Sequence, residues 1–531
     1  MTLTRPLPQQ ELRDSRPRRR GSRGRTAAAL LSVIAGGALS LAFDPVGASL
    51  LGPVSIAAFT VAVCLFADTA RGGAVLGYLF GFAFLAAHVW WLKDSIGPGA
   101  WAAVTFVESL WFAAMGALIP LLRRLPAWPV LVAVMWSSVE VVRQMWPFGG
   151  FPWGQVGFTT VDTPVSAALP YVGVTGAGFI IALLATAVAY GVVAGRCNPR
   201  RAVLYLAAPL AMTVVPQLVP VDVARTGSVT VAVVQGDVPG SGDDVAGNHR
   251  QITRDHARAT VDLARQVESG TAPRPDLVVW PENSTAVDPI RDLEANTEIS
   301  MAATAIQTPL LVGGIVDGPR PGTALNQGIL WTESGPDGQA YTKQHPVPFG
   351  EFIPFRSLLD GLSPRLAEIP RDMLPGAEAE PLDIDTEEGI VRIADAICFD
   401  VAYADPIAQQ VRSGAELVVV QTSNAMFTGT SQREQQFTMS RARALETGRT
   451  VIVASLNGIS GIITADGEVL ARLEERTTDT MLEEVATSRA ATPAVRLMPV
   501  IDASLLGVAA IGAIWALIAS SMGRLRARPD R

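Results

Sequence analysis

Eight long apolar runs dominate the pattern of hydrophobic and polar positions in this chain. Seven precede a more polar region and one follows it, at 27–43, 49–67, 73–92, 99–122, 127–145, 164–194, 202–221 and 501–521. Each run is close to or longer than the roughly 17–25 residues that a helix needs to cross a bilayer. The run at 164–194 is long enough to include a re-entrant or interfacial start. The pattern therefore predicts a polytopic bundle of eight transmembrane helices.

The pattern changes at Gly227, where short β-rich runs alternate with helix-compatible segments. Strands are predicted at 229–235, 277–280, 310–314, 327–331, 391–397, 417–421 and 451–455, and helices at 248–268, 292–307 and 432–446. Alternating strands and helices favour one α/β domain with a layered core. The stretch 353–376 lacks a regular pattern, and loops of that length in compact domains are often lids.

These patterns divide the chain into four parts. They are a basic tail at 1–25, a seven-helix membrane domain at 26–226, an α/β domain at 227–490, and an eighth helix with a second basic tail at 491–531. Hydrophobic residues make up 49% of the chain and charged residues 17%, with a mean hydropathy of +0.31. This composition argues against a purely soluble protein.

Basic residues indicate the orientation of the bundle. The first 25 residues contain eight arginines and the last eight contain four. Alternate loops hold most of the other basic residues: Arg71, Arg123, Arg124, Arg196, Arg200 and Arg201 on one side, against Lys93 and Arg143 on the other. The positive-inside rule then puts both termini in the cytoplasm and the α/β domain outside it. The basic ends flank apolar spans, so they fit anionic lipid surfaces better than nucleic acid.

Three acidic or basic residues lie within the predicted spans. Glu140 and Arg143 are three residues apart, so they share a helix face and are predicted to form an ion pair or a headgroup anchor. Glu108 has no partner that can be identified from the sequence. Ionisable groups at membrane depth are often functional, but we favour the structural interpretation for these.

The numbers and spacing of the cysteines and histidines argue against disulfide bonds and metal sites. Cys64, Cys197 and Cys398 are too few and too scattered for a disulfide framework. The four histidines form neither an HxxH nor an HExxH pattern, so we expect neither a metal site nor a cofactor.

Three residues that close or follow predicted strands have complementary chemistry: Glu282, Lys343 and Cys398. A thiol attacks as its thiolate, a carboxylate can take the thiol proton, and an ammonium group can stabilise thiolate and oxyanion. Taken singly, each has an ordinary explanation as a buried apolar cysteine, a helix-capping glutamate or a solvated lysine. His345 is a rival base for a Cys–His arrangement, and we weight the Glu–Lys–Cys set above it.

The surrounding motifs resemble the apolipoprotein N-acyltransferase family, a membrane-embedded branch of the nitrilase-like carbon–nitrogen hydrolases. The resemblance runs nearly end to end. Its motifs are Gly150-Phe-Pro-Trp-Gly-Gln-Val-Gly-Phe158, Val234-Gln-Gly-Asp237, Trp280-Pro-Glu-Asn-Ser284, Val347-Pro-Phe-Gly-Glu-Phe-Ile-Pro-Phe-Arg356, Ile397-Cys-Phe-Asp400, Thr422-Ser-Asn424, Arg441-Ala-Arg-Ala-Leu-Glu-Thr-Gly-Arg449 and Asn457-Gly458. It implies an αββα nitrilase-like sandwich on the outer face of the helical bundle.

The resemblance also implies roles for individual residues. Glu282 would be the general base, Lys343 the stabiliser of the intermediate and Cys398 the nucleophile. Supporting positions would be Glu351, Asn326 and Phe399, the last through its backbone N–H as an oxyanion donor. Ser423 and Asn424 would lie at the substrate. Two departures stand out: Phe399-Asp400 replaces the usual Tyr-Glu, and Ala425-Met426 begins a segment that lacks a usual tryptophan.

The implied reaction is acyl transfer in two half-steps. Cys398 takes a fatty acyl chain from a membrane phospholipid, and the α-amine of a diacylglyceryl-cysteine at the N-terminus of an apolipoprotein then accepts it. The apolar residues in 353–359 are a hypothetical entrance for acyl chains. One rival is a nitrilase-like amidase or hydrolase with water as acceptor. A second is a transporter or sensor with an inert α/β domain.

Overall fold

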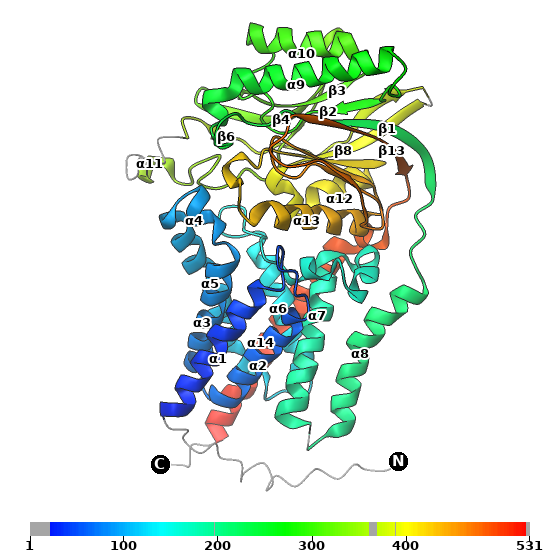
Figure 1. Cartoon of the computed structure of the whole chain (residues 1–531). Coiled ribbons are helices and arrows are strands. Elements are labelled where there is room, and N and C mark those ends of the chain that lie inside the picture. Colours follow the sequence, from blue (N-terminus) through cyan, green and yellow to red (C-terminus); the bar gives the residue numbers. More distant parts are fainter. Residues whose placement is uncertain (1–21, 196, 360–368, 388, 527–531) are drawn as a thin grey trace.

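The chain folds into a helical bundle with an α/β domain at one end of it (Figure 1). The computed structural model describes residues 22–195, 197–359, 369–387 and 389–526. The basic tails predicted at 1–25 and 491–531 therefore lie partly outside the described residues, as do Arg196 and part of the predicted lid. Within 353–376, the described residues include the short helix α11 (Arg356–Leu359) and the two-residue strand β6 (Asp372–Met373).

The bundle contains a long helix at each of the eight apolar runs. Its helices are α1 (Ser22–Ser40), α2 (Leu51–Phe66), α3 (Ala70–His88), the short α4 (Trp91–Ser95), α5 (Pro98–Leu122), α6 (Trp128–Arg143), α7 (Leu169–Ala194), α8 (Pro199–Leu218) and α14 (Pro493–Arg526), with the 3-10 turns η1 (Val156–Thr160) and η2 (Pro164–Ala168). In the described part of the chain, five segments are long and apolar enough to cross a membrane: 70–88, 98–122, 164–194, 199–218 and 493–521. The chain is therefore a membrane protein, while the number of eight crossings stays a prediction.

The α/β domain consists of two sheets packed face to face. One sheet has the order β13-β1-β2-β3-β4-β5, with β6 paired to β4, and the other has the order β12-β11-β10-β9-β8-β7. Their strands are β1 (Arg225–Gln235), β2 (Leu277–Val279), β3 (Leu310–Asp317), β4 (Thr323–Thr332), β5 (Gly335–Thr342), β7 (Leu382–Thr386), β8 (Gly389–Ile397), β9 (Leu417–Thr422), β10 (Val451–Ser455), β11 (Gly461–Ile463), β12 (Val469–Arg472) and β13 (Asp479–Ser488).

Helices cover the outer face of each sheet, which completes the four layers that the resemblance implies. The outer pair is α9 (Val245–Glu268) and α10 (Leu293–Ile306), and the inner pair is α12 (Asp405–Arg412) and α13 (Gln432–Thr447). All seven predicted strands and all three predicted helices coincide with observed elements. The sequence analysis missed α12 and the strands β5–β7 and β11–β13, each of which is short or lies at the edge of its sheet.

The alternation of side chains along each strand allows the inner sheet to pack against the outer sheet on one face and against helices on the other. In β9, Leu417 and Val419 pack between the two sheets, whereas Val418 and Val420 face the helices beneath. Successive side chains of a strand point to opposite faces. The second set belongs to a buried apolar cluster that continues into the membrane helices, so the inner sheet, α13 and the bundle share one core.

The helix α13 provides much of the contact between the two domains. Glu446 accepts a hydrogen bond of 2.9 Å from the backbone N–H of Val174, where α7 is interrupted. Gly173 makes this interruption with a φ of 66°, and a Cβ at this position would lie 2.5 Å from Glu446 Oε1. A carboxylate at the freed N–H of a broken helix satisfies a donor that would otherwise be costly to bury. The long run at 164–194 thus begins with η2 and one irregular turn, consistent with the interfacial start expected there.

The ion pair inside the bundle differs from the predicted one. Arg143 Nε lies 2.7 Å from Glu108 Oε2, and both side chains are buried. Glu140 accepts instead from Trp136 Nε1 at 3.1 Å and from the backbone N–H of Val156 at 2.9 Å. The prediction that Glu140 pairs with Arg143 was wrong, because helical spacing identifies residues on one face but does not identify which neighbouring helix packs against that face.

The bundle is packed tightly where α1 crosses α3. A Cβ built on Gly36 of α1 would lie 2.1 Å from the backbone oxygen of Phe80 in α3. The adjacent Gly37 has nothing within 4 Å of the same position. Small residues at such crossings allow membrane helices to approach closely.

This contrast gives a test with neighbouring residues. We expect Gly36→Ala to lower the free energy of unfolding by about 1–3 kcal/mol, because the extra methyl group forces α1 away from α3. Gly37→Ala is the matched control, and alanine's higher helix propensity should leave its stability unchanged or slightly raised. Thermal unfolding in detergent measures both, and equal melting temperatures for the two variants would contradict the close crossing.

Candidate functional site

The candidate residues lie where strands of the two sheets end. Glu282 follows β2, Lys343 follows β5, Cys398 follows β8 and Ser423 follows β9. Because β8 and β9 are parallel, as are β1, β2 and β3, their carboxyl ends lie together at one edge of each sheet. Residues far apart in the sequence therefore meet at one place, as in other open α/β sheets.

Lys343 lies between two carboxylates. Its Nζ is 3.2 Å from Glu282 Oε1 and 2.8 Å from Glu351 Oε1, and its side chain is 1% exposed. Burial alone would lower the pKa of an ammonium group, but the charges of Glu282 and Glu351 outweigh it and hold the pKa of Lys343 well above its usual value. Lys343 is therefore a permanent positive charge in the site.

Hydrogen bonds fix both carboxylates. Asn326 Nδ2 donates to Glu282 Oε1 at 2.8 Å and to Glu351 Oε1 at 3.2 Å. The backbone N–H of Ser423 donates to Glu282 Oε2 at 2.9 Å, and that of Val347 donates to Glu351 Oε2 at 2.7 Å. Burial, and then the charge of Glu282, raise the pKa of Glu351, although Lys343 opposes the shift. Each carboxylate oxygen therefore has a defined donor, so the orientation of both groups is constrained.

Cys398 has an unusual backbone conformation. It begins the 3-10 turn η4 (Cys398–Ala402) and has a φ of 52°. Residues other than glycine rarely adopt this region, and when they do the strain is commonly found at functional sites. The turn presents the sulfur beyond the end of β8, where Gln436 Nε2 donates to Sγ at 3.5 Å.

The environment of Cys398 keeps its thiol protonated. Burial, followed by the negative charge of Glu282, raises the pKa of the Cys398 thiol to about 12, while Lys343 and a hydrogen bond with Thr422 act in the opposite direction. At neutral pH the resting group is therefore a neutral thiol. A nucleophilic thiolate forms here only if a nearby base takes the proton.

Asp400 and Phe399 hold the turn that contains the sulfur. Asp400 is buried and accepts hydrogen bonds from Tyr341 Oη at 2.8 Å, from the backbone N–H of His345 at 2.8 Å and from that of Ile397 at 3.2 Å. Burial raises the pKa of Asp400, against the effects of His345 and Lys343. The ring of Phe399 stacks on Trp153 of the membrane domain, with 6.2 Å between centroids. The shortened acid therefore still anchors the turn.

The side chain of Asn424 forms hydrogen bonds with other side chains of the protein. Its Nδ2 donates to Gln432 Oε1 at 3.1 Å and to Gln436 Oε1 at 2.6 Å, and its Oδ1 accepts from Ser455 Oγ at 3.1 Å. Ser423 contributes its backbone N–H to Glu282. Both residues belong to the same cluster as Cys398, and their predicted contact with substrate stays a prediction.

The side chain of His345 contacts Asp405 and Tyr403. Its Nε2 lies 3.1 Å from Asp405 Oδ2, and its ring stacks on Tyr403 with 3.6 Å between centroids. Among the described residues, no hydrogen bond joins His345 to Cys398. His345 is therefore occupied by Asp405 and Tyr403, and the role of Glu282 as the base stays a prediction.

Some residues at the site were missed in the sequence analysis. Thr422 and Gln436 contact the sulfur, and Tyr341 anchors Asp400. Gln436 lies in a segment predicted only as a helix, where two adjacent glutamines were the available signal. In the described part of the chain, no group of three or more His, Cys, Asp or Glu side chains could hold a metal ion.

Comparisons with known proteins cover both halves of the chain. The family model of the apolipoprotein N-acyltransferase N-terminal domain matches residues 35–187, and that of the carbon-nitrogen hydrolases matches residues 230–493. An apolipoprotein N-acyltransferase from Mycolicibacterium smegmatis is 32% identical over 527 residues, which cover 93% of this chain and 87% of that protein. One from Photobacterium profundum is 27% identical over 488 residues, covering 87% and 90%.

Among solved structures, Saccharomyces cerevisiae Nit3, a member of the nitrilase superfamily, is 20% identical, with a TM-score of 0.36 and coverage of 49% of this chain and 91% of that one. The assignment depends on the two family models, which match in order along the sequence, and on a relative above 30% identity over nearly the whole length. The chain belongs to the apolipoprotein N-acyltransferase family, and its second half is a nitrilase-like carbon–nitrogen hydrolase domain.

Proposed function

We propose that this protein transfers a fatty acyl chain from a membrane phospholipid, through a thioester on Cys398, to the α-amine of a diacylglyceryl-cysteine at the N-terminus of an apolipoprotein. Family membership supports the N-acylation of lipoproteins. The single structural observation that carries the proposal is the cluster of buried Glu282 and Lys343 with the half-buried Cys398, beside a turn whose Phe399 stacks on Trp153 of the membrane domain. A site in this position gains proximity to two substrates that are both anchored in lipid.

In the first half-step, Glu282 takes the proton of the Cys398 thiol as the sulfur attacks the ester carbonyl carbon. The carbonyl oxygen becomes an oxyanion, for which Lys343 and the backbone N–H of Phe399 are the proposed donors. The ester C–O bond then breaks, and the leaving glycerol oxygen takes the proton from Glu282. A thioester and a lysophospholipid result.

In the second half-step, the α-amine attacks the thioester carbonyl carbon and loses a proton to Glu282. The C–S bond breaks and the sulfur regains a proton, which restores the resting thiol. Glu351 and Asn326 orient Glu282 and Lys343 without exchanging protons with the substrate. The cycle needs only the residues of this cluster.

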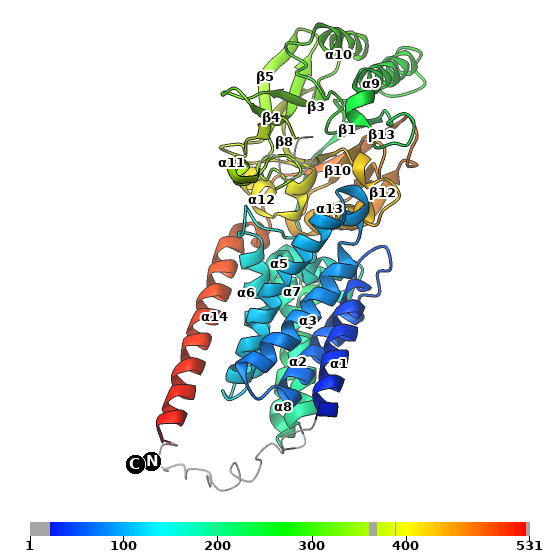
Figure 2. The same cartoon turned by 90° about the vertical axis from the view of Figure 1, so that its left-hand side faces the viewer.

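We infer that the α/β domain, 227–490, is extracytoplasmic and that both termini of the eight-span membrane part are cytoplasmic, in the plasma membrane of a bacterium. The beginning of α1 and the end of α14 both lie at the end of the bundle away from the α/β domain (Figure 2). Arg123 and Arg124, after α5, and Arg200 and Arg201, at the start of α8, lie toward the same end. This distribution supports a cytoplasmic position for that end.

The thioester gives the most direct test of the proposed function. Incubation with phospholipid should add one acyl group to Cys398, and Cys398→Ala should abolish both this adduct and transfer to a diacylglyceryl-cysteine peptide. Cys197→Ser is the control, because Cys197 is exposed and lies in the loop before α8. Intact-protein mass spectrometry and product analysis measure both steps. Full transfer by Cys398→Ala would overturn the mechanism, and release of free fatty acid with no acylated peptide would favour the hydrolase alternative.

The buried ion pairs predict a specific pattern of stability. Lys343→Met should lower the free energy of unfolding by about 3–5 kcal/mol, because it leaves Glu282 and Glu351 without their counter-charge. Adding Glu351→Gln removes one of these charges and should recover part of the loss, while neither variant forms the thioester. Thermal unfolding and thioester yield are the measurements. Single and double variants with the melting temperature of the unmodified protein would contradict this role of Lys343.

The raised pKa predicts how Cys398 responds to pH. Because the pKa lies near 12, the thiolate fraction should increase about tenfold for each pH unit between pH 7 and 9. Alkylation of Cys398 by iodoacetamide should increase in the same proportion. Peptide mass spectrometry follows the reaction, with a Cys197→Ser background to remove the exposed competing thiol. A rate that levels off below about pH 9 would show that the thiol is more acidic than its burial implies.

A further inference from the structure

Gln436 of α13 is a buried amide that touches the sulfur of Cys398 without being part of the Glu–Lys–Cys cluster. Its side chain is 3% exposed, and Nε2 lies 3.5 Å from Sγ. The opposite end of the amide is also occupied: Oε1 accepts from Asn424 Nδ2 at 2.6 Å and from Thr422 Oγ1 at 3.2 Å. Every polar atom of this side chain therefore has a partner inside the site.

The bond from Asn424 to Oε1 determines which end of the amide faces the sulfur, because the Thr422 hydroxyl could pair with either end. An amide carbonyl only accepts and an amide NH2 only donates. If the amide were reversed, its NH2 group would face the NH2 group of Asn424 at hydrogen-bond distance, with two donors opposed and no acceptor between them. Gln436 is therefore held with its N–H groups toward Cys398.

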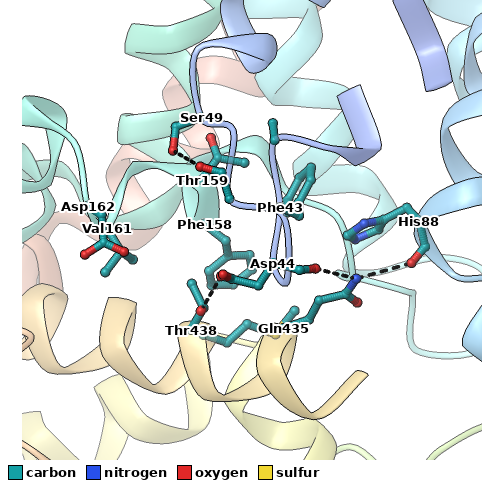
Figure 3. A pocket seen from close by; sticks show the side chains of 13 residues that line it. Phe43, Asp44, Ser49, His88, Phe158, Thr159, Val161, Asp162, Gln435 and Thr438 are labelled. Atoms are coloured by element: carbon teal, nitrogen blue, oxygen red, sulfur yellow. Dashed lines mark hydrogen bonds between the residues drawn. The ribbon is translucent and has the colours of Figure 1, made fainter. Parts of the chain in front are cut away.

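The preceding residue fixes this turn of α13 from the membrane side. Gln435 Oε1 accepts from Trp153 Nε1 at 2.7 Å and from Trp91 Nε1 at 3.1 Å. Its Nε2 donates to the backbone oxygens of Asp44 at 3.2 Å and His88 at 3.3 Å, at the edge of a small pocket between the domains (Figure 3). Gln436 thus extends from a backbone that the membrane domain immobilises.

We propose that Gln436 is a further catalytic residue, which donates an N–H hydrogen bond to the Cys398 sulfur and stabilises the thiolate during attack. This inference rests on the proposed function of Cys398 as the nucleophile. A hydrogen bond to a charged acceptor is roughly twice as strong as one to a neutral acceptor. The bond therefore strengthens as the proton moves from sulfur to Glu282, and it weakens again when the S–C bond forms. Gln436 itself exchanges no proton.

The donor role differs from a purely structural one in the direction of its effect on thiol reactivity. If Gln436 only filled space, its loss would loosen the site and expose the half-buried thiol further, so alkylation of Cys398 would become faster. If its N–H stabilises the thiolate, loss of the donor makes alkylation slower. The two possibilities therefore predict opposite changes in the same measurement.

Two substitutions separate the donor from charge and shape. Gln436→Glu keeps an oxygen for Asn424 and Thr422 but removes the N–H, and Gln436→Leu removes the N–H without adding charge. We expect both variants of the full-length protein to react with iodoacetamide at Cys398 about tenfold more slowly at pH 8, corresponding to the loss of one charge-assisted hydrogen bond. Thioester formation at saturating phospholipid should slow by about the same factor, with little change in the half-saturating phospholipid concentration.

Each possible result has a clear interpretation. Slow labelling in Gln436→Glu alone would indicate a charge effect and overturn the proposal, as would unchanged or faster labelling in both variants. Melting temperatures, measured in the same detergent, establish that the labelled proteins are folded. The labelling assay needs no acyl substrate, so it reports on Gln436 even if Cys398→Ala were to retain acyl transfer and so remove the proposed function.

Discussion

The position of α13 between the membrane helices and the turn at Cys398 is the constraint on which this structure depends. Through Glu446 the helix binds the N–H that the break at Gly173 leaves free in α7. Through Arg443, which is paired with Glu446, it donates to the backbone oxygens of Val401 and Ala402, both at 2.9 Å. These carbonyls belong to the turn that begins at Cys398. A single buried ion pair therefore connects a membrane helix to the backbone beside the sulfur.

This connection explains why the two domains share one core. A buried pair of charges is stable only when further hydrogen bonds satisfy its remaining donors and acceptors. Here the α7 N–H and the two carbonyls meet that requirement, so the pair forms only when bundle, helix and turn are assembled together. Trp153 and Phe399 add stacking across the same boundary. The location of the sulfur is thereby set relative to the lipid-embedded helices as well as to its own sheet.

The electrostatics of the site follow from the balance of charges around it. One ammonium group, Lys343, faces two carboxylates, and the half-buried thiol of Cys398 lies close enough to feel their charges. A thiolate would add a third negative charge, so the resting state keeps the proton on sulfur. Such a thiol is protected from adventitious alkylation and oxidation, which follow thiolate character.

Local patterns in the sequence were sufficient to predict much of the fold. Apolar runs marked the eight long helices of the bundle, and alternating apolar residues marked the strands that form the centre of both sheets. Glu282, Lys343 and Cys398 could be selected because each ends a strand-like run within a family motif. In contrast, β5 and β7 lie at the edges of the sheets and carry polar residues, so their sequences lack the apolar pattern that predicts a buried strand.

Contacts between residues that lie far apart in the chain could be identified only from the tertiary structure. Spacing within α6 suggested that Arg143 pairs with Glu140, whereas packing of α5 against α6 gives it Glu108. Gln435 and Gln436 are adjacent and chemically identical, yet one binds two tryptophans of the membrane domain and the other contacts the sulfur. Periodicity records whether a position is buried, and it predicted the long helices and the central strands, while motifs supplied the candidate site residues. Which elements pack together depends on the whole assembled core, so the ion pairs, the docking of α13 and the donor to Cys398 were decided only by the tertiary structure.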